Sequence, residues 1–338
     1  SVGEFHYLHN QPGGAPYMRA SAMADALAAA AASSGIAMTL LPTLYMSAAA
    51  DGRALTARQK RFGKTVDQLL KLRESMGGKP GVANIGLALH SLRAVPPAAM
   101  REAIAGVDAS SPIHVHAAEQ AGEVEECVRF LGARPIEYLI ENLGVDRRWC
   151  LVHSTHMTAE ETRALAASGA VAGLCPTTEA NLGDGIFPLP DYLTAGGRFA
   201  IGGDSHIAVD PAAELKALEY SQRLALQRRN VAASAAVPHT AVRLWSDAAR
   251  NGAVALGLGS GEIAAGGRAD FVVVDTDHPS LAARDGLHAI DSFVFVAGRD
   301  AVRDVLVGGA KVVENGRHAQ EERAAADYRA AVRNILAS

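Results

Sequence analysis

Three short segments of this chain carry residues whose types and spacing suit metal binding and proton transfer. The first is His114-Val115-His116, with Glu119 three residues further on. On a β-strand the residues i and i+2 share a face, so both imidazoles could point to one side, and Glu119 could carry a proton beside a bound metal. In the simpler interpretation the histidines hydrogen-bond to neighbouring residues and Glu119 opens the next helix. This motif alone leaves both interpretations open.

The second segment, 152–156, contains His153 and His156, and the third contains Asp204 after two glycines. His153 ends an apolar run and could contact a substrate or a metal-bound water, whereas we expect His156 to make a local structural contact. Asp204 could bind a metal and accept a proton from its water. Alternatively, it caps the helix that follows Asp210.

The three segments support one another when they are considered together. His116, His153 and Asp204 at successive strand ends match the nitrogen and oxygen donors that zinc or a similar divalent ion prefers. No lysine lies at these strand ends, so a carbamylated lysine that bridges two metals is excluded. We therefore predict a site for one metal ion.

Short apolar runs that alternate with helical patterns would position these residues. The predicted strands are 1–7, 36–45, 82–90, 113–118, 149–154, 170–175 and 199–203, and the clearest helical patterns between them are 57–75, 122–131 and 159–168. Strands that are apolar throughout and separated by helices predict a parallel sheet.

A (β/α)₈ barrel and a doubly wound sheet both fit this order. Polar residues follow most of the strands, and these include His90, His116, His153, Glu179, Asp204 and His206. In a barrel all such strand ends meet at one mouth, whereas a doubly wound sheet binds ligands at a single switch point. No glycine-rich phosphate fingerprint follows any strand. We therefore predict a barrel that lacks its first strand.

Glycines and short β-rich pieces distinguish the last third of the chain. Segments 269–275, 292–297, 302–307 and 310–314 are predicted strands, and a helix is expected from about residue 321 to 337. We expect the barrel to span 1–255, a small β-sandwich portion 256–320, and a C-terminal helix 321–338.

Composition narrows the classes of partner and compartment. The net charge is −4, with 32 Lys and Arg against 36 Asp and Glu, which predicts no nucleic-acid or anionic-membrane partner. The alanine-rich stretch 24–32 is too weakly apolar to span a bilayer and is expected to be an outer helix of the fold. Three widely spaced cysteines indicate a reducing compartment, which predicts a cytoplasmic location.

In this order along the chain, the motifs resemble the amidohydrolase superfamily, whose members combine a (β/α)₈ barrel with a small β-sandwich. The tail segments 261–275 and 302–318 resemble the returning part of that sandwich. Within the superfamily the resemblance is strongest to the formimidoylglutamate deiminases of histidine degradation. It is carried by segments 3–9, 89–94, 114–120, 149–156 and 178–193. We expect the last segment to form a long loop that shapes the substrate pocket.

The resemblance implies a role for each matching residue. His116 and Asp204 would bind one divalent ion, most simply Zn²⁺. Glu119 would protonate the leaving nitrogen, and His153 with Asp204 would orient and deprotonate the metal-bound water.

The resemblance also implies the substrate. His90 and Arg93 would hold N-formimino-L-glutamate, with Tyr7 as a helper, and the products would be N-formyl-L-glutamate and ammonia. An arginine at the mouth suits bidentate recognition of a dicarboxylate. A homodimer is expected from the resemblance alone.

One feature of the superfamily is missing from this sequence. The first barrel strand of the superfamily carries a His-x-His pair that supplies two metal ligands, and no such strand precedes segment 1–7. We expect that an N-terminal portion of the protein holds this pair. The chain by itself would then bind metal poorly and leave strand edges unpaired, so it is expected to fold poorly alone.

Two other functions remain open at this point. A related deaminase that acts on a purine, pyrimidine or triazine would need flat-ring contacts, and only 5% of the residues are aromatic. A catalytically silent relative would be expected to lose its proton-handling residues, but Glu119, His153 and Asp204 are all present.

Overall fold

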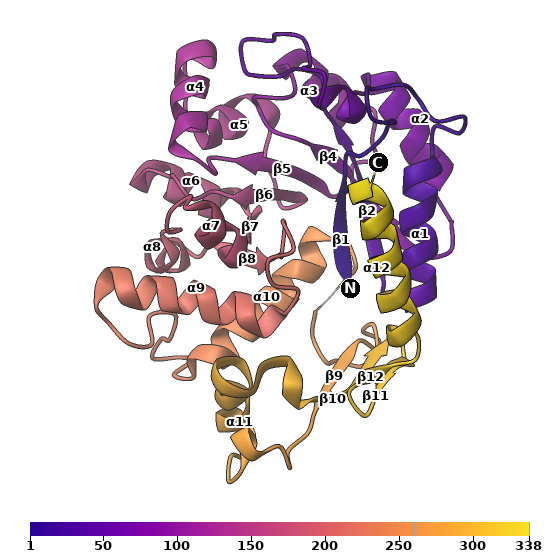
Figure 1. The fold of residues 1–338 in the computed structure, drawn as a ribbon. Helices are drawn as coiled ribbons and strands as arrows, with labels where there is room; N and C mark the ends of the chain where they lie inside the picture. The colour runs from indigo at the N-terminus through magenta and orange to yellow at the C-terminus, as the bar shows by residue number, and fades with distance from the viewer. Residues whose placement is uncertain (260, 338) are drawn as a thin grey trace.

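The computed structural model describes residues 1–259 and 261–337, and its centre is a curved, parallel β-sheet (Figure 1). Its strands are β1 Val2–His6, β2 Met38–Leu44, β3 Val82–Ile85, β4 Leu87–Leu89, β5 Ile113–Ala117, β6 Trp149–His153, β7 Val171–Leu174 and β8 Arg198–Ile201. The strand order is β1-β2-β4-β5-β6-β7-β8, with β3 paired to β2.

The sheet order identifies the architecture. Neighbouring strands follow the order of the chain, without the reversal that defines the switch point of a doubly wound sheet. No pairing joins β8 to β1 among the described residues. The predicted barrel without its first strand is therefore confirmed.

The predicted strand 82–90 is divided in two at Gly86. A Cβ atom at Gly86 would lie 2.7 Å from both a Leu41 methyl group and the Pro112 carbonyl oxygen, so only glycine fits there. β3 then pairs with the start of β2, and β4 pairs with its end and with β5.

Helices lie around the curved sheet (Figure 1). They are α1 Ala22–Ser34, α2 Val66–Met76, α3 Pro97–Ala105, α4 Ala121–Leu131, α5 Pro135–Leu143, α6 Ala159–Ser168, α7 Pro176–Leu182, α8 Leu189–Thr194, α9 Pro211–Leu226 and α10 Thr240–Ala255. The alanine-rich segment forms α1 and buries Ala24, Ala28 and Ala31, which lie on one helical face. No helix in the described part of the chain is long and apolar enough to cross a membrane.

Capping residues explain where two of the helices begin. Thr65 and Thr158 each accept a hydrogen bond from the backbone N–H three residues on, and a Gln or Glu side chain completes the capping box. The pattern predicted as one helix over 57–75 is therefore a 3₁₀ turn, Gln59–Phe62, followed by α2.

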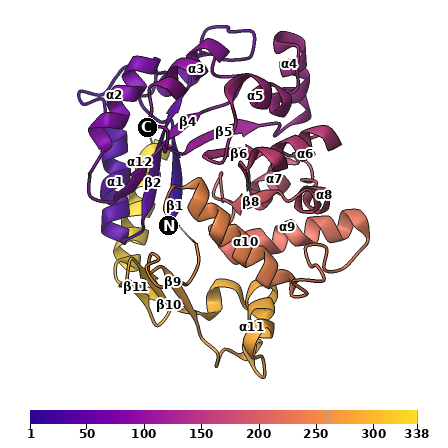
Figure 2. The same cartoon turned by 180° about the vertical axis from the view of Figure 1, so that it is seen from behind.

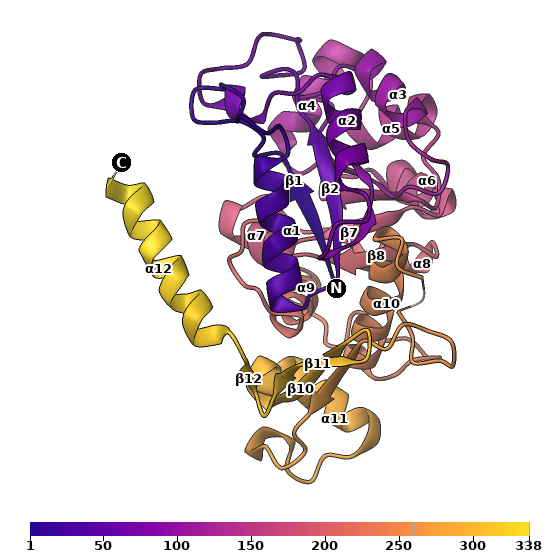
Figure 3. The same cartoon turned by 90° about the vertical axis from the view of Figure 1, so that its right-hand side faces the viewer.

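A second, antiparallel sheet lies below the barrel, with the order β12-β11-β10-β9. Its strands are β9 Phe271–Val274, β10 Val302–Val307, β11 Ala310–Glu314 and β12 Arg317–His318. Helix α12, Glu321–Ala337, buries none of its residues and stands away from the body of the molecule (Figure 3).

The predicted strand 292–297 is wrong. Residues Phe293–Ala297 form a π-helical turn that continues α11, Gly286–Ser292, and 3₁₀ turns Pro279–Leu281 and Gly298–Ala301 flank the two. Phe293 and Val294 are buried in the core cluster of the barrel, so tertiary packing has overridden the β-propensity of the segment. The predicted domain limits at 255 and 320 stay a prediction.

The C-terminal end of α10 is held by side chains from three strands. Its last carbonyls have no partner within the helix. His114 bonds through Nε2 to the Ala255 carbonyl at 2.7 Å, and the Thr39 hydroxyl and the Asn84 amide donate to the Leu256 carbonyl. Figure 2 shows α10 running from the β8 side of the sheet toward β1. His114 thus has the structural role that the simpler interpretation gave it.

A pair of buried histidines lies on and just beyond β1. The rings of His6 and His9 are 4.9 Å apart, and His9 is 2% exposed, with Nε2 2.9 Å from the Thr43 carbonyl oxygen. Burial lowers the pKa of His9 to about 3, aided by the charges of His6 and Lys64 and opposed by the bond to Thr43. The fold therefore keeps His9 neutral.

Acid should weaken the fold through His9. Its pKa is about 3 in the folded chain and 6.5 when unperturbed, so its contribution is fully present above pH 6.5 and is lost progressively as the pH falls toward 3. Between pH 6.5 and 5 this loss is about 2 kcal/mol. His9→Gln keeps a donor for the Thr43 carbonyl. Its free energy of unfolding, measured with urea, should fall less between pH 7 and pH 5 than that of the parent. His278→Gln is the control, and equal losses in both variants and the parent would contradict the assignment.

Candidate functional site

Three histidine rings line up at the C-terminal edge of β4, β5 and β6. The His90 and His116 ring centroids are 5.0 Å apart, and those of His116 and His153 are 5.5 Å apart and nearly parallel. The Tyr7 ring, just beyond β1, meets His90 edge to face at 5.4 Å. The structure thus brings together four of the sequence-predicted site residues, which lie on or just beyond β1, β4, β5 and β6.

His116 has the features of a metal-ligating histidine. Its Nδ1 lies 2.9 Å from the His90 carbonyl oxygen. A carbonyl can only accept, so Nδ1 carries the proton and Nε2 keeps its lone pair. Burial, together with the charges of His90 and His153, lowers the pKa of His116 well below its ordinary value. The neutral ring, fixed in this tautomer, suits a divalent ion of the zinc type.

Asp204 is the other predicted ligand, and it lies in the exposed turn after β8. It does not cap α9, because Asp210 is the residue whose side chain accepts from the helix backbone, at Ala212. The Ser205 hydroxyl is 3.4 Å from Asp204 Oδ2. A catalytic zinc site has three protein ligands, so His116 and Asp204 would be part of a larger set.

His153 lies between two carboxylates. Its Nε2 is 3.7 Å from Glu119 Oε1, and its Nδ1 is 3.2 Å from Glu179 Oε1. Burial acts to lower the pKa of His153, but the hydrogen bond to Glu179 and the charges of Glu119, Glu179 and Asp204 outweigh it, so the pKa is raised. His153 therefore holds a proton more tightly than an exposed histidine, so it is the stronger base.

The pKa of Glu119 is higher than that of an exposed glutamate. Burial is the largest effect and raises its pKa, and the charges of Asp184, Glu123 and Asp204 add to this, while His153 opposes it. A glutamate that holds its proton more tightly is a better proton donor at neutral pH. Glu119 and His153 are therefore an acid and a base in a geometry that suits proton transfer.

Glu179 is a part of this site to which the sequence analysis assigned no role. It is 5% exposed and lies in the first turn of α7, where it also accepts the Cys175 backbone N–H at 2.8 Å. A glutamate in the first turn of a helix is an ordinary feature. From the sequence, Glu179 could be placed at the barrel mouth, but no sequence pattern indicates that this carboxylate bonds to His153.

Backbone conformations that non-glycine residues rarely adopt are concentrated at this mouth. Residues with a left-handed φ include Ala118, His153, Ser154, Asp204 and His206, with values from 42° to 68°. Ala118, His153 and Ser154 end or directly follow β5 or β6, and Asp204 and His206 lie in the turn after β8. Such strain persists where the surroundings enforce it, and it commonly marks functional sites.

His90 and Arg93 lie on the β4 side of the mouth. Burial lowers the pKa of His90 to about 3, and the charge of Arg93 adds to the effect. Arg93 is half-buried, and its Nε has no partner among the described residues. A buried guanidinium N–H without a partner is costly, and an anionic group of a ligand would satisfy it.

The segment 178–193 is mostly helical, so the prediction of a long loop is wrong. It comprises the end of α7, a link of 183–188, and the start of α8. Within the link, Asp184 accepts the Gln120 amide at 3.0 Å, and its backbone carbonyl accepts His156 Nε2 at 2.7 Å. The link is thus tied to the residue beside Glu119. His156 makes the local contact that was expected.

The fold and this geometry can be compared with known proteins. The amidohydrolase family profile matches residues 3–312. Formimidoylglutamate deiminase of Pseudomonas aeruginosa is 43% identical over 327 residues, which are 96% of this chain and 72% of that protein. The crystal structure of an amidohydrolase from Brucella melitensis superposes with a TM-score of 0.92 at 40% identity, over 98% of this chain and 74% of that one.

A more distant structure shares the fold alone. An adenosine deaminase from Xanthomonas campestris with bound zinc superposes with a TM-score of 0.77 at 22% identity, over 93% of this chain and 70% of that one. The family match extends over most of the sequence, and the sheet order and the cluster of histidines and carboxylates at the mouth agree with it. The chain belongs to the amidohydrolase family.

Proposed function

We propose that this protein hydrolyses the formimino group of N-formimino-L-glutamate, a step of histidine degradation. Water replaces the terminal nitrogen, giving N-formyl-L-glutamate and ammonia. The observation that carries the proposal is the pair of Glu119 and His153, 3.7 Å apart beside the ring of His116. The similarity to formimidoylglutamate deiminase of P. aeruginosa over 96% of the chain supports the choice of substrate.

His116, through Nε2, and Asp204 would hold one divalent ion, for which zinc is proposed because of the nitrogen and oxygen donors. When bound, such an ion supplies Lewis-acid activation of water near neutral pH. The ring of His116 is prepared for this role by its bond to the His90 carbonyl.

The residues of the chain would divide the proton transfers between them. His153 and Asp204 orient the attacking water and take its proton, and Glu179 keeps the His153 ring in place through Nδ1. Glu119, with its raised pKa, donates a proton to the departing nitrogen so that ammonia leaves. The C–O bond forms first and the C–N bond breaks afterwards. Water loses one proton on attack and the second as the C=O bond forms, and these two protons balance the two that the NH group gains on leaving as ammonia.

Substrate binding would use the β4 side of the mouth. Arg93 would pair with a carboxylate of the substrate through its buried Nε. His90 and Tyr7 would contact the part of the substrate between its carboxylates and its formimino group. We also propose a homodimer in the cytoplasm, as the resemblance implies, with neither nucleic acid nor membrane as a partner.

A deaminase of a flat heterocycle is the second candidate, and one observation favours it. Tyr7, Tyr45 and Phe62 pack on one another at centroid distances of 5.1–6.4 Å, and Tyr7 and Tyr45 both contact His90. Aromatic rings beside a binding site suit a planar substrate.

Substrate preference should separate the two candidates. The intact protein with zinc supplied should release ammonia from N-formimino-L-glutamate and not from guanine, because Arg93 requires an anionic group. The measurement is a coupled ammonia assay. Release from guanine alone would favour the second candidate, and release from neither, with metal bound, would overturn the proposal.

Glu119→Gln should lower kcat at least about 100-fold and leave KM nearly unchanged, because the amide cannot donate the proton that the leaving nitrogen needs. Metal content should stay the same. Glu125→Gln, an exposed change on α4, is the matched control. Near-normal turnover by Glu119→Gln would exclude this role.

Glu179→Gln tests whether the charge of Glu179 supports His153. The Cys175 N–H and His153 Nδ1 both bond to Oε1 of Glu179, so the amide oxygen of glutamine can keep both bonds, and the substitution removes the negative charge that raises the pKa of His153. We expect kcat to fall at least about tenfold, with KM, metal content and thermal midpoint close to those of the parent. Glu160→Gln, exposed at the start of α6, is the control. A change in KM or stability with kcat retained would point to a merely structural role.

A further inference from the structure

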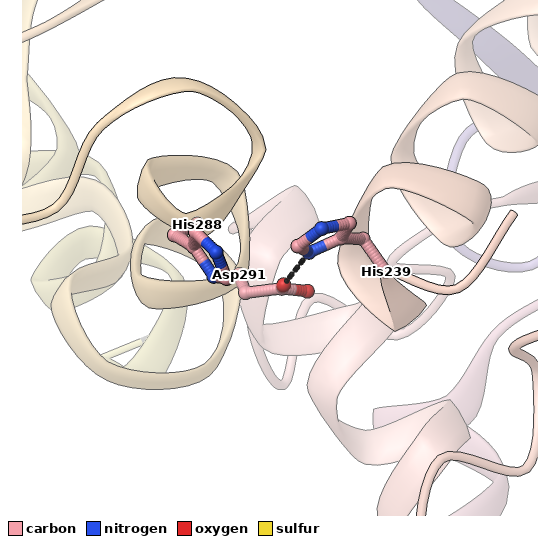
Figure 4. Close-up of side chains that lie close together, drawn as sticks. All are labelled: His239, His288 and Asp291. Atoms are coloured by element: carbon pink, nitrogen blue, oxygen red, sulfur yellow. Dashed lines mark hydrogen bonds and ion pairs between the residues drawn. The ribbon is translucent and has the colours of Figure 1, made fainter.

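A second group of metal-capable side chains lies outside the barrel mouth, where α10 begins and α11 packs against it. His239 precedes the first residue of α10, and His288 and Asp291 belong to α11. Figure 4 shows His288 and Asp291 reaching from α11 toward His239. None of these residues has a role in the proposed deimination.

The ligand atoms of the three side chains are close to one another. One nitrogen or oxygen from each lies within 4.8 Å of the other two. The rings of His239 and His288 meet edge to face with centroids 4.8 Å apart. In α11, His288 and Asp291 are three residues apart, so they share a helical face that is directed at His239.

Helix capping explains only part of this arrangement. Asp291 accepts the Ala241 backbone N–H at 3.0 Å and bonds to His239 Nδ1 at 2.6 Å, as expected of a carboxylate that caps the start of α10. His288 has no part in that cap. Its exposed imidazole contacts the His239 ring but makes no hydrogen bond to any described residue.

We propose that His239, His288 and Asp291 bind a divalent transition-metal ion of the zinc, cobalt or nickel class. Two imidazole nitrogens and one carboxylate oxygen are the donors that these ions prefer, and water would complete the coordination. In a tetrahedral site the donors lie about 3.3 Å apart, so a separation at the upper limit of 4.8 Å would have to close by about 1.5 Å. The exposed side chain of His288 can make this movement by rotating.

A metal ion at this place would fix α11 onto α10. His239 and Asp291 are 52 positions apart in the sequence. An ion that binds only the folded arrangement stabilises it by mass action. The proposed role is therefore a structural cross-link between the barrel helix and the segment that leads into β10.

The test must separate this site from the barrel mouth. His116→Ala removes one proposed ligand at the mouth and provides the background. In that background, metal-free protein is titrated with Co²⁺ and followed by its visible absorption. Thermal unfolding is then measured with and without Zn²⁺.

We expect Co²⁺ to bind in the His116→Ala background and Zn²⁺ to raise its thermal midpoint. Adding His288→Ala should weaken Co²⁺ binding at least about tenfold and remove the rise, since one of three ligands is lost. His288 is exposed, so this variant should fold as the parent does. His278→Ala is the control for the loss of a nearby imidazole. It also removes the acceptor of the Ser280 N–H, so only its Co²⁺ affinity and its Zn²⁺-dependent rise are compared, and both should be unchanged. Equal Co²⁺ affinity and an equal Zn²⁺ effect with and without His288 would overturn the proposal.

Discussion

The register between β4, β5 and β6 is the constraint on which the site depends. Leu89 pairs with Val115, and Ala117 pairs with His153, so the residues that end these strands lie at one edge of the sheet. This places the His116 ring between those of His90 and His153. Because side chains alternate between the faces of a strand, a slip of one residue in β5 would turn His116 to the outer face. The apolar residues between the histidines are buried, and their packing prevents such a slip.

The same alternation gives β5 two different functions along one face. His114 and His116 point to the inside of the curved sheet, two residues apart. The first binds the α10 carbonyl end and is buried, whereas the second reaches the mouth and is partly exposed. A single His-x-His motif therefore contacts the end of α10 through one histidine and reaches the barrel mouth with the other. This explains why the motif alone left two interpretations open, since each applies to one of its histidines.

Much of this fold could be predicted from the sequence because buried parallel strands are apolar runs of distinctive length. All seven predicted runs of the barrel lie in its sheet, and the residues that follow them meet at its mouth. What the sequence could not supply depends on contacts between distant segments. Phe293 and Val294 have high β-propensity but turn helical to pack on the barrel, and Gly86 breaks a strand because Pro112 lies against it. Glu179 is inconspicuous until β6 brings His153 to it.

The charges at the mouth are divided between its two sides, and this division bears on the substrate. Glu119 and Glu179 flank His153, and the charges of Asp184 and Asp204 add to the field that raises the pKa of Glu119. Carboxylates held so close together repel one another, so this side favours positive charge. Arg93, on the β4 side, instead lacks an anionic partner at Nε.

A ligand that carries a cationic amidine at one end and carboxylates at the other would satisfy both sides at once. Formiminoglutamate has this distribution of charge, whereas a neutral heterocycle would leave Arg93 unpaired and the carboxylates uncompensated. Since unpaired buried charge costs more than a well-paired charge contributes, the electrostatics of the mouth favour the amidine over the ring. The aromatic cluster of Tyr7, Tyr45 and Phe62 then serves as the wall against which His90 is held.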